Sequence, residues 1–79
     1  MKIFVRAGGL LLDYLKPDVD AYTRAFEIAE GQTLGEVLAT VGIRPVHVAM
    51  VFAGGKIVDL DYRPRDGETL SLRPPVQGG

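Results

Sequence analysis

The sequence predicts a two-layer α+β domain in which one main helix packs on a mixed sheet of four or five strands. Several short segments alternate polar and apolar residues, as half-buried strands do. One segment carries the start signal of an amphipathic helix. The chain has 79 residues, which is enough for one domain, and its apolar fraction of 47% is that of a folded protein.

Residues 2–6 are the first predicted strand, because Ile3 and Val5 point to one side while Lys2, Phe4 and Arg6 point to the other. This alternation is typical of a strand with one buried face.

Two further segments precede the main helix. Leu11 and Leu15 stand four residues apart after a glycine pair, so we expect one or two helical turns that end at Pro17. After a polar loop, residues 24–30 alternate again with Phe26 and Ile28 on one side, which predicts a second strand.

The main helix is predicted over residues 33–41. Thr33 and Glu36 have the spacing of a capping box, in which each side chain accepts a hydrogen bond from the other residue's backbone N–H. Gly42 follows where a left-handed residue ends many helices. One helical face carries the apolar residues Leu34, Val37, Leu38 and Val41.

The last third of the chain reads as three strands. Residues 47–53 are rich in strand formers, the pair Gly54-Gly55 is a turn, and residues 56–58 begin a short strand. In the final strand, residues 69–73, Leu70 and Leu72 point inward. We expect this strand at the centre of the sheet, because an edge position would expose its apolar pattern.

Composition argues against several classes of function. The net charge of −1 is unlike that of a nucleic-acid-binding protein. No apolar run approaches the roughly 18 residues of a membrane helix, and no signal peptide is visible, so we expect a cytoplasmic protein.

The sequence also lacks the usual equipment of an enzyme. It has no cysteine and a single histidine, His47, which is predicted as an outward-facing strand residue. Asp59, Asp61 and Asp66 lack the spacing of a calcium loop and are predicted as solvated turn residues. We therefore expect a protein that is not an enzyme and has no metal site.

Two features suggest a binding role. Phe4, Ala49, Val51 and Ser71 are predicted to share the sheet face away from the helix, where apolar side chains would form a docking surface. Behind the predicted domain of residues 1–73, residues 74–79 are predicted as a flexible functional tail. Its two prolines favour an extended stem, and its two glycines leave a thin tip that can pass through a narrow site.

Four stretches form a recognisable set along the chain: Glu30-Gly31-Gln32-Thr33, Val41-Gly42-Ile43, Asp66-Gly67-Glu68 and the ending Pro74-Pro75-Val76-Gln77-Gly78-Gly79. In this order they resemble the MoaD/ThiS family of sulfur carriers, which have the ubiquitin-like β-grasp fold. The segments "MKIFVR" and "MVFAGGKIVD" also resemble ubiquitin. The chain departs from the family pattern at Gly54, Pro64 and Arg73, and Arg73 stands beside the tail where it would affect the choice of partner.

The resemblance implies that a ubiquitin-activating-type adenylyltransferase adenylates the carboxylate of Gly79, which a sulfur donor then converts to a thiocarboxylate. The activating enzyme would supply ATP and Mg, since the sequence has no phosphate-binding loop, and no cofactor is expected on the chain itself. The residues expected to insert into partners are Gly78, Gln77, Val76, Pro75 and Pro74, and those expected to dock are Phe4, Ala49, Val51, Ser71 and Arg73.

The pathway that receives the sulfur stays open. The ending "PPV.GG" favours the small-subunit type of molybdopterin synthase, with the large subunit of that synthase as acceptor. The alternatives are a carrier for thiazole synthase in thiamine synthesis, a carrier for tRNA thiolation, a ubiquitin-like modifier that forms isopeptide bonds through Gly79, and an interaction module with an inert tail.

Overall fold

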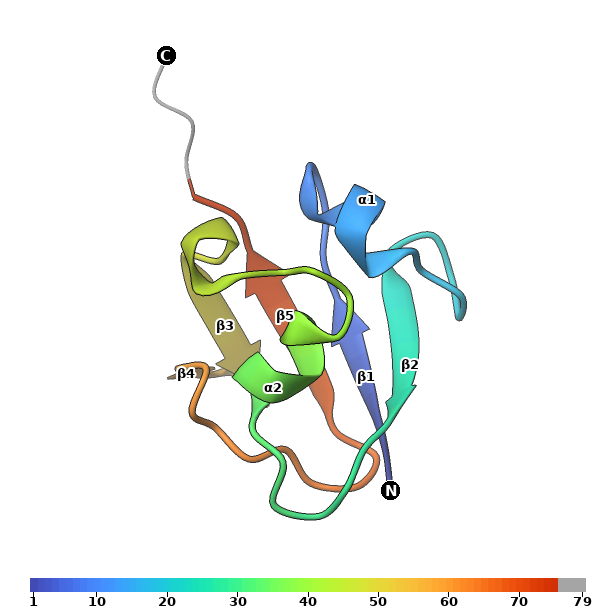
Figure 1. Ribbon diagram of the computed structural model, residues 1–79, viewed down its shortest axis with the longest axis vertical. Helices are drawn as coiled ribbons and strands as arrows, with labels where there is room; N and C mark the ends of the chain where they lie inside the picture. Colours follow the sequence, from blue (N-terminus) through green and yellow to red (C-terminus); the bar gives the residue numbers. More distant parts are fainter. Residues whose placement is uncertain (76–79) are drawn as a thin grey trace.

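The structure is a computed structural model that describes residues 1–75. In this part of the chain a mixed five-stranded sheet has the order β2-β1-β5-β3-β4 and carries helix α2 on one face (Figure 1). The strands are β1 (Lys2–Arg6), β2 (Thr23–Glu27), β3 (Met50–Ala53), β4 (Lys56–Val58) and β5 (Thr69–Arg73). The helices are α1 (Leu11–Leu15), α2 (Leu34–Ala39) and the 3-10 turn η1 (Pro45–His47). The predicted α+β β-grasp fold is confirmed, with five strands.

Strand β5 lies at the centre of the sheet, as predicted. It pairs in parallel with β1 on one side and antiparallel with β3 on the other. The remaining pairs, β1 with β2 and β3 with β4, are antiparallel. The β3–β4 turn uses Gly54 at φ 59° and Gly55 at φ 81°, and the two positive φ angles are those that a tight hairpin of matching twist requires.

The core lies between the sheet and the two helices. The inward residues of the central strands, Ile3, Val5, Leu70 and Leu72, are buried there. The helices cover them with Leu11 and Leu15 from α1 and with Leu34, Val37 and Leu38 from α2.

Helix α2 is capped as the sequence predicts, although it is shorter at its C-terminal end. Thr33 is the N-cap: its hydroxyl accepts from the Glu36 N–H (3.2 Å), and the Glu36 carboxylate accepts from the Thr33 N–H (2.9 Å). Val41 lies beyond the helix and packs partly buried against the core, while Gly42 has the expected left-handed φ of 83°. The amides of the first turn are also satisfied, because the Leu34 and Gly35 N–H groups donate to loop carbonyls at 2.8 Å.

The segment before β3 differs from the prediction. The strand expected over residues 47–53 starts only at Met50, because residues 45–47 form η1. His47 is therefore not a strand residue, and that placement was wrong. Its Nδ1 accepts from the Arg44 N–H (3.0 Å), and its ring stacks on Tyr14 with the centroids 4.9 Å apart. A proline at the start of η1 favours this turn, since its fixed φ suits the first helical position.

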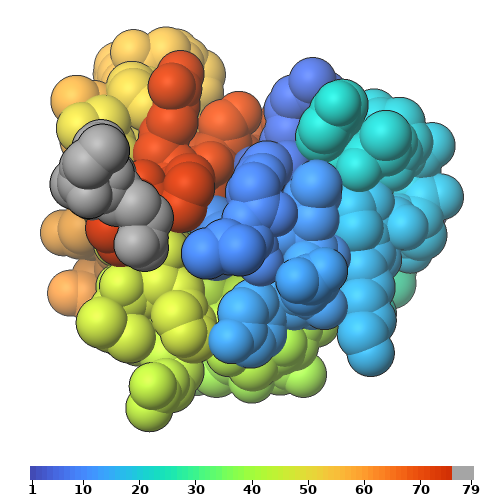
Figure 2. Space-filling view, turned by 90° about the horizontal axis from the view of Figure 1, so that it is seen from above, coloured from blue at the N-terminus to red at the C-terminus, as the bar shows by residue number. Residues whose placement is uncertain are grey.

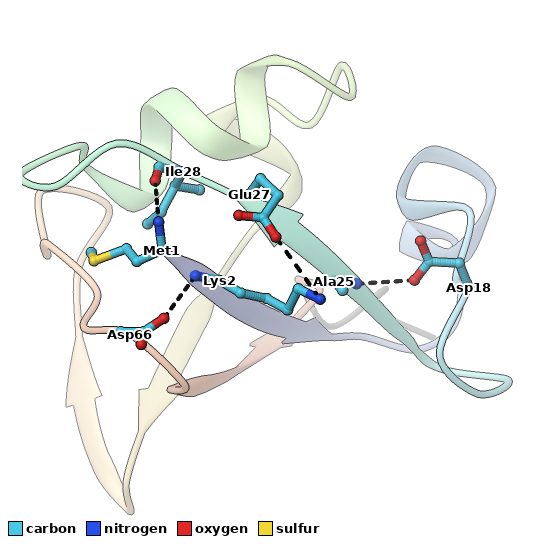
Figure 3. A network of polar contacts seen from close by, with 7 residues as sticks. All are labelled: Met1, Lys2, Asp18, Ala25, Glu27, Ile28 and Asp66. Carbon is cyan, nitrogen blue, oxygen red and sulfur yellow. Dashed lines mark hydrogen bonds and ion pairs between the residues drawn. The ribbon is translucent and has the colours of Figure 1, made fainter.

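The open edge of β2 is protected by the loop that precedes it. The Asp18 carboxylate accepts from the Ala25 N–H at 3.0 Å (Figure 3). The Asp18 and Val19 N–H groups donate to the Thr23 carbonyl. These contacts occupy the groups that an edge strand otherwise offers to another chain. The strand itself, Thr23–Glu27, is shorter than the predicted 24–30.

The N-terminus is tied to the sheet by backbone bonds. The Met1 ammonium donates to the Ile28 carbonyl (3.0 Å), and the Ile28 N–H donates to the Met1 carbonyl (2.8 Å). The Lys2 N–H donates to the Asp66 carboxylate at 2.8 Å, so this exposed aspartate holds a turn against β1 (Figure 3). No helix within residues 1–75 has the length and apolar character needed to cross a membrane.

Candidate functional site

The tail leaves the domain from the end of its central strand. The last ladder contact is the Ala49 N–H donating to the Arg73 carbonyl at 2.8 Å. Pro74 follows and has no N–H to donate, so the ladder with a neighbouring strand ends there. Pro74 is half-buried and Pro75 is exposed, which makes this pair the root of the tail. The predicted tail residues Val76, Gln77, Gly78 and Gly79 lie outside the described residues.

The sheet face away from α2, called here the outer face, is partly apolar. The structure places Phe4 and Ser71 on it, half-buried, as predicted. Phe52 lies opposite Ser71 in the ladder and joins them on this face. Exposed apolar side chains at its β3–β4 side are Met50 and Ile57.

Val51 does not belong to the outer face, and its predicted placement was wrong. The side chain is 2% exposed and lies opposite Leu72 and Val58, within the core. Ala49 lies two residues before Val51 and precedes the start of β3. It is exposed beside the tail root. The outer-face residues of β3 are therefore Met50 and Phe52, which sequence reasoning missed.

Two arginines flank the tail root on the outer face. The Cζ of Arg73 lies 5.3 Å from the ring centroid of Phe52, and the Cζ of Arg6 lies 5.4 Å from that of Tyr22. Cations over aromatic rings are attracted by the negative ring face. A carboxylate oxygen of Asp20 is 3.9 Å from Arg6. Hydrogen bonds from the Tyr22 N–H and from Thr23 are the main reason that the pKa of Asp20 is lowered, and Arg6 adds to them.

An apolar hollow opens on the other side of the tail root. Leu10 and Tyr14 line it from the α1 side, Val46 and His47 from η1, and Pro74 from the tail root. Figure 2 views the molecule from this end, with the β1–α1 segment in blue facing the yellow-green η1 region and the red end of β5. Leu10 and Val46 are 68% and 67% exposed, so apolar surface borders this side of the tail root. No periodic pattern in the sequence indicates this hollow, because its walls come from separate segments.

Among residues 1–75, no group of three or more His, Asp or Glu side chains is placed to hold a metal ion. One acidic contact is close: the Tyr62 hydroxyl donates to a Glu68 carboxylate oxygen at 2.7 Å, which raises the pKa of Tyr62. This hydrogen bond stabilises the loop before β5, away from the tail root. The geometry presents a partly apolar outer face, whose central strand β5 runs at one end into the tail root.

Comparison with known proteins agrees with this architecture. Residues 1–78 match the model of a family described as Mut7-C ubiquitin. A search of curated proteins gave no match.

Solved structures provide the fold. SAMP1 from Haloferax volcanii matches with a TM-score of 0.73 and 19% identity over 100% of both chains. A second structure of that organism's small archaeal modifier protein 1 gives a TM-score of 0.71 at 18% identity, covering 95% of this chain and 98% of that chain. A protein named as molybdopterin converting factor, subunit 1, from Pyrococcus furiosus gives 0.67 at 17% identity, again over 95% of this chain and 98% of that chain.

Proposed function

Because the chain belongs to the Mut7-C ubiquitin family, we propose that it is a sulfur carrier that is activated at the carboxylate of Gly79. Its fold is that of a MoaD-like, ubiquitin-like protein. In this proposal the chain is a cosubstrate that other proteins modify, and it performs no catalysis itself.

The chemistry follows from the weakness of a carboxylate as an electrophile. A carboxylate oxygen of Gly79 attacks the α-phosphorus of ATP and expels pyrophosphate, which leaves an acyl-adenylate. Hydrosulfide then attacks the acyl carbon and expels AMP, and loss of the remaining proton leaves a thiocarboxylate. The chain has no cysteine, so a side-chain thiol cannot hold the sulfur and the terminal acyl group is the available place. Since the first step consumes ATP, we propose that it takes place in the cytoplasm.

The observation that carries the proposal is the origin of the tail. Strand β5 is paired with β1 as far as Ser71 and with β3 as far as Arg73, and Pro74-Pro75 follow at once. Prolines have few backbone states, so a stem of this kind loses little entropy when a partner orders it. The glycines beyond have no Cβ, which allows close approach of an enzyme to the backbone.

The partners we propose are an adenylyltransferase of the ubiquitin-activating type, which brings ATP and Mg, and a synthase that accepts the sulfur. Phe4, Phe52 and Ser71 on the outer face, with Arg73 beside the tail root, are the proposed contacts. Ala49 stays a candidate because it is exposed next to Arg73, whereas the burial of Val51 removes it from the docking set.

The neighbours support two versions of this role. The name of the Pyrococcus furiosus protein favours a small subunit of molybdopterin synthase, as does the "PPV.GG" ending. The name of the Haloferax volcanii protein favours a modifier that forms isopeptide bonds with lysines. Sulfur delivery to thiazole synthase or to tRNA uses the same activated end, so these remain alternatives.

The test begins with the intact mass of the protein purified from its source, which must correspond to a chain ending at Gly79. The protein is then incubated with the adenylyltransferase, MgATP and sulfide. We expect a mass gain equal to the replacement of one oxygen by sulfur, located on Gly79 by fragmentation.

Tail variants provide the controls. Deleting Gly79 and adding one residue after it should each abolish the mass gain, because both displace the carboxylate from the reacting position. Arg65→Ala, at an exposed position in the loop before β5, leaves the tail unchanged and should retain the mass gain. If the activated protein yields lysine conjugates without a thiocarboxylate, the modifier role replaces the carrier role. Full function of the deletion variant in cells would exclude both.

A further inference from the structure

A second hollow at the tail root differs in character from the apolar one. It lies on the outer face between the β1–α1 segment and the end of β5, with a volume of about 430 Å³ (Figure 2). Two arginines, a hydroxyl and an aromatic ring contribute to its walls, together with backbone of the glycine pair. We call it the cationic cleft; its main residues are Arg6, Gly8, Tyr22, Ser71, Arg73 and Pro74.

The sheet register brings the two arginines together. Arg6 is the last residue of β1 and lies opposite Ser71 of β5 in the parallel ladder. Arg73 follows Ser71 by two residues and therefore points to the same face. Two positive charges thus stand on adjacent strands at the end from which the tail leaves.

Aromatic rings hold both guanidinium groups in position. Tyr22 lies under Arg6 and Phe52 lies under Arg73, at 5.4 and 5.3 Å from ring centroid to Cζ. An aromatic face takes none of the in-plane N–H donors that a guanidinium uses to bind a carboxylate. Both groups are therefore restricted in position while their donors stay available, which lowers the entropy cost of binding.

The local negative charge does not neutralise the cleft. Asp20 approaches Arg6 only to 3.9 Å, with both side chains about half exposed at 52%. The Tyr22 N–H donates to the same carboxylate at 2.8 Å, so Asp20 is held mainly by backbone. Exposed ion pairs contribute about 0–1 kcal/mol, and a better acceptor displaces them easily. Within residues 1–75, Arg73 forms no ion pair.

We infer that the cationic cleft binds carboxylate side chains at the rim of the activating enzyme's tail-receiving channel. Pro74 is part of the cleft wall, so any protein that encloses the tail from its root also covers the cleft. Covering two guanidinium groups without a partner is costly, because buried charges need pairing. The enzyme must therefore present Asp or Glu residues there. This inference rests on the proposed function and specifies the chemistry of the partner surface.

The inference is tested with the charge reversals Arg6→Glu and Arg73→Glu and with the double variant. Arg65→Glu is the matched control: it makes the same charge change at an exposed residue in the loop before β5, at the opposite end of the sheet from the tail. Circular dichroism verifies that all four variants fold. Calorimetry measures their affinity for the adenylyltransferase, and intact mass measures sulfur transfer in parallel.

We expect each cleft reversal to weaken binding by about tenfold or more, and Arg65→Glu by less than about twofold. Raising NaCl from about 50 to about 500 mM should weaken the wild-type complex and leave the double variant much less affected.

The outcomes separate the two proposals. If wild-type protein gains sulfur while the cleft reversals bind like Arg65→Glu, the cleft inference is overturned and the carrier function stands. If wild-type protein binds with the expected arginine dependence but gains no mass, the carrier function fails and the cleft stands as a docking site. If wild-type protein does not bind the enzyme, both are overturned.

Discussion

The neighbouring residues Val51 and Phe52 allow a direct test of the sheet register, because the same substitution should have opposite consequences at the two positions. Val51 is 2% exposed in the core, opposite Leu72, whereas Phe52 is half-buried on the outer face. Val51→Asp should destabilise the fold strongly, and Phe52→Asp should leave it close to the stability of the wild type.

The magnitude follows from burial. Removing a buried valine forfeits about 1.5–3 kcal/mol of transfer free energy. Placing a polar group there without a partner costs about 1–3 kcal/mol more. The total of about 3–6 kcal/mol is a large part of the roughly 4–12 kcal/mol expected for a domain of 79 residues. Phe52→Asp removes only half-buried surface and introduces a carboxylate beside Arg73, so its cost should stay near 1 kcal/mol.

The assay is urea denaturation followed by circular dichroism. With a slope of about 1 kcal/mol per molar urea, the two midpoints should differ by about 2 M or more. Val51→Ala is the control for size alone and should cost about 2 kcal/mol, since two methyl groups are lost. Equal midpoints for the two aspartate variants would refute the register. Loss of binding to the activating enzyme can then be assigned to docking for Phe52→Asp, but not for Val51→Asp.

Four further predictions concern helix ends and pH. Thr33→Ala removes the cap of α2 and should cost about 1 kcal/mol by urea denaturation; an unchanged midpoint would mean that the capping box adds nothing. Hydrogen bonds from the Thr33 backbone and side chain lower the pKa of Glu36 below 4.5. The free energy of unfolding should therefore decrease as the pH drops through that lowered value. In Thr33→Ala the decrease with acid should be shallower, because the side-chain hydrogen bond is gone. The pKa of Tyr62 is raised above 10.0 chiefly by its bond to Glu68, so the free energy of unfolding should decrease as the pH rises through the raised value; a Tyr62→Phe variant that shows the same alkaline decrease would contradict this. Gly42→Ala should cost about 1 kcal/mol in the same urea assay, because its φ of 83° is unfavourable for a residue with a Cβ. The added Cβ would lie 3.7 Å from Tyr14, an ordinary contact, so the backbone conformation is the source of the cost. A midpoint equal to that of the wild type would argue against the left-handed turn.

Local patterns predicted the parts of this fold that local chemistry determines. The capping box requires only Thr33 and Glu36, three residues apart, and it forms as expected. The alternation of Ile3 and Val5 with Phe4 allows one orientation of β1, because the polar residues around Phe4 mark the outer side. The central place of β5 followed from Leu70 and Leu72 in the same way.

The orientation of β3 was not determined locally. Every residue from 48 to 53 is apolar, so the odd-numbered and the even-numbered residues are equally suited to the buried face of the strand. A slip of one residue exchanges the two faces of a strand. Only the pairing of Val51 with Leu72 and of Phe52 with Ser71 decides which set is buried, and this pairing joins segments far apart in the chain. The placement on the outer face was therefore predicted correctly for Phe4 and Ser71 and wrongly for Val51.

The two hollows at the tail root depend even more on tertiary structure. Arg6 and Arg73 come from opposite ends of the described chain, and the parallel pairing of β1 with β5 makes them neighbours. Arg73 was noticed in the sequence as a departure from the family pattern, but no local signal links it to Arg6 or to the rings beneath the two guanidinium groups.

The parallel pairing of β1 and β5 also determines how the domain responds to mechanical force. The N-terminus and the tail root lie at opposite ends of these two adjacent strands (Figure 1). Traction on the tail against an anchored N-terminus therefore slides β5 along β1 and loads their hydrogen bonds simultaneously in shear, instead of opening them one after another like a zipper. A partner that grips the tail and pulls can draw it taut, while the sheet resists extraction of the strand from which the tail emerges.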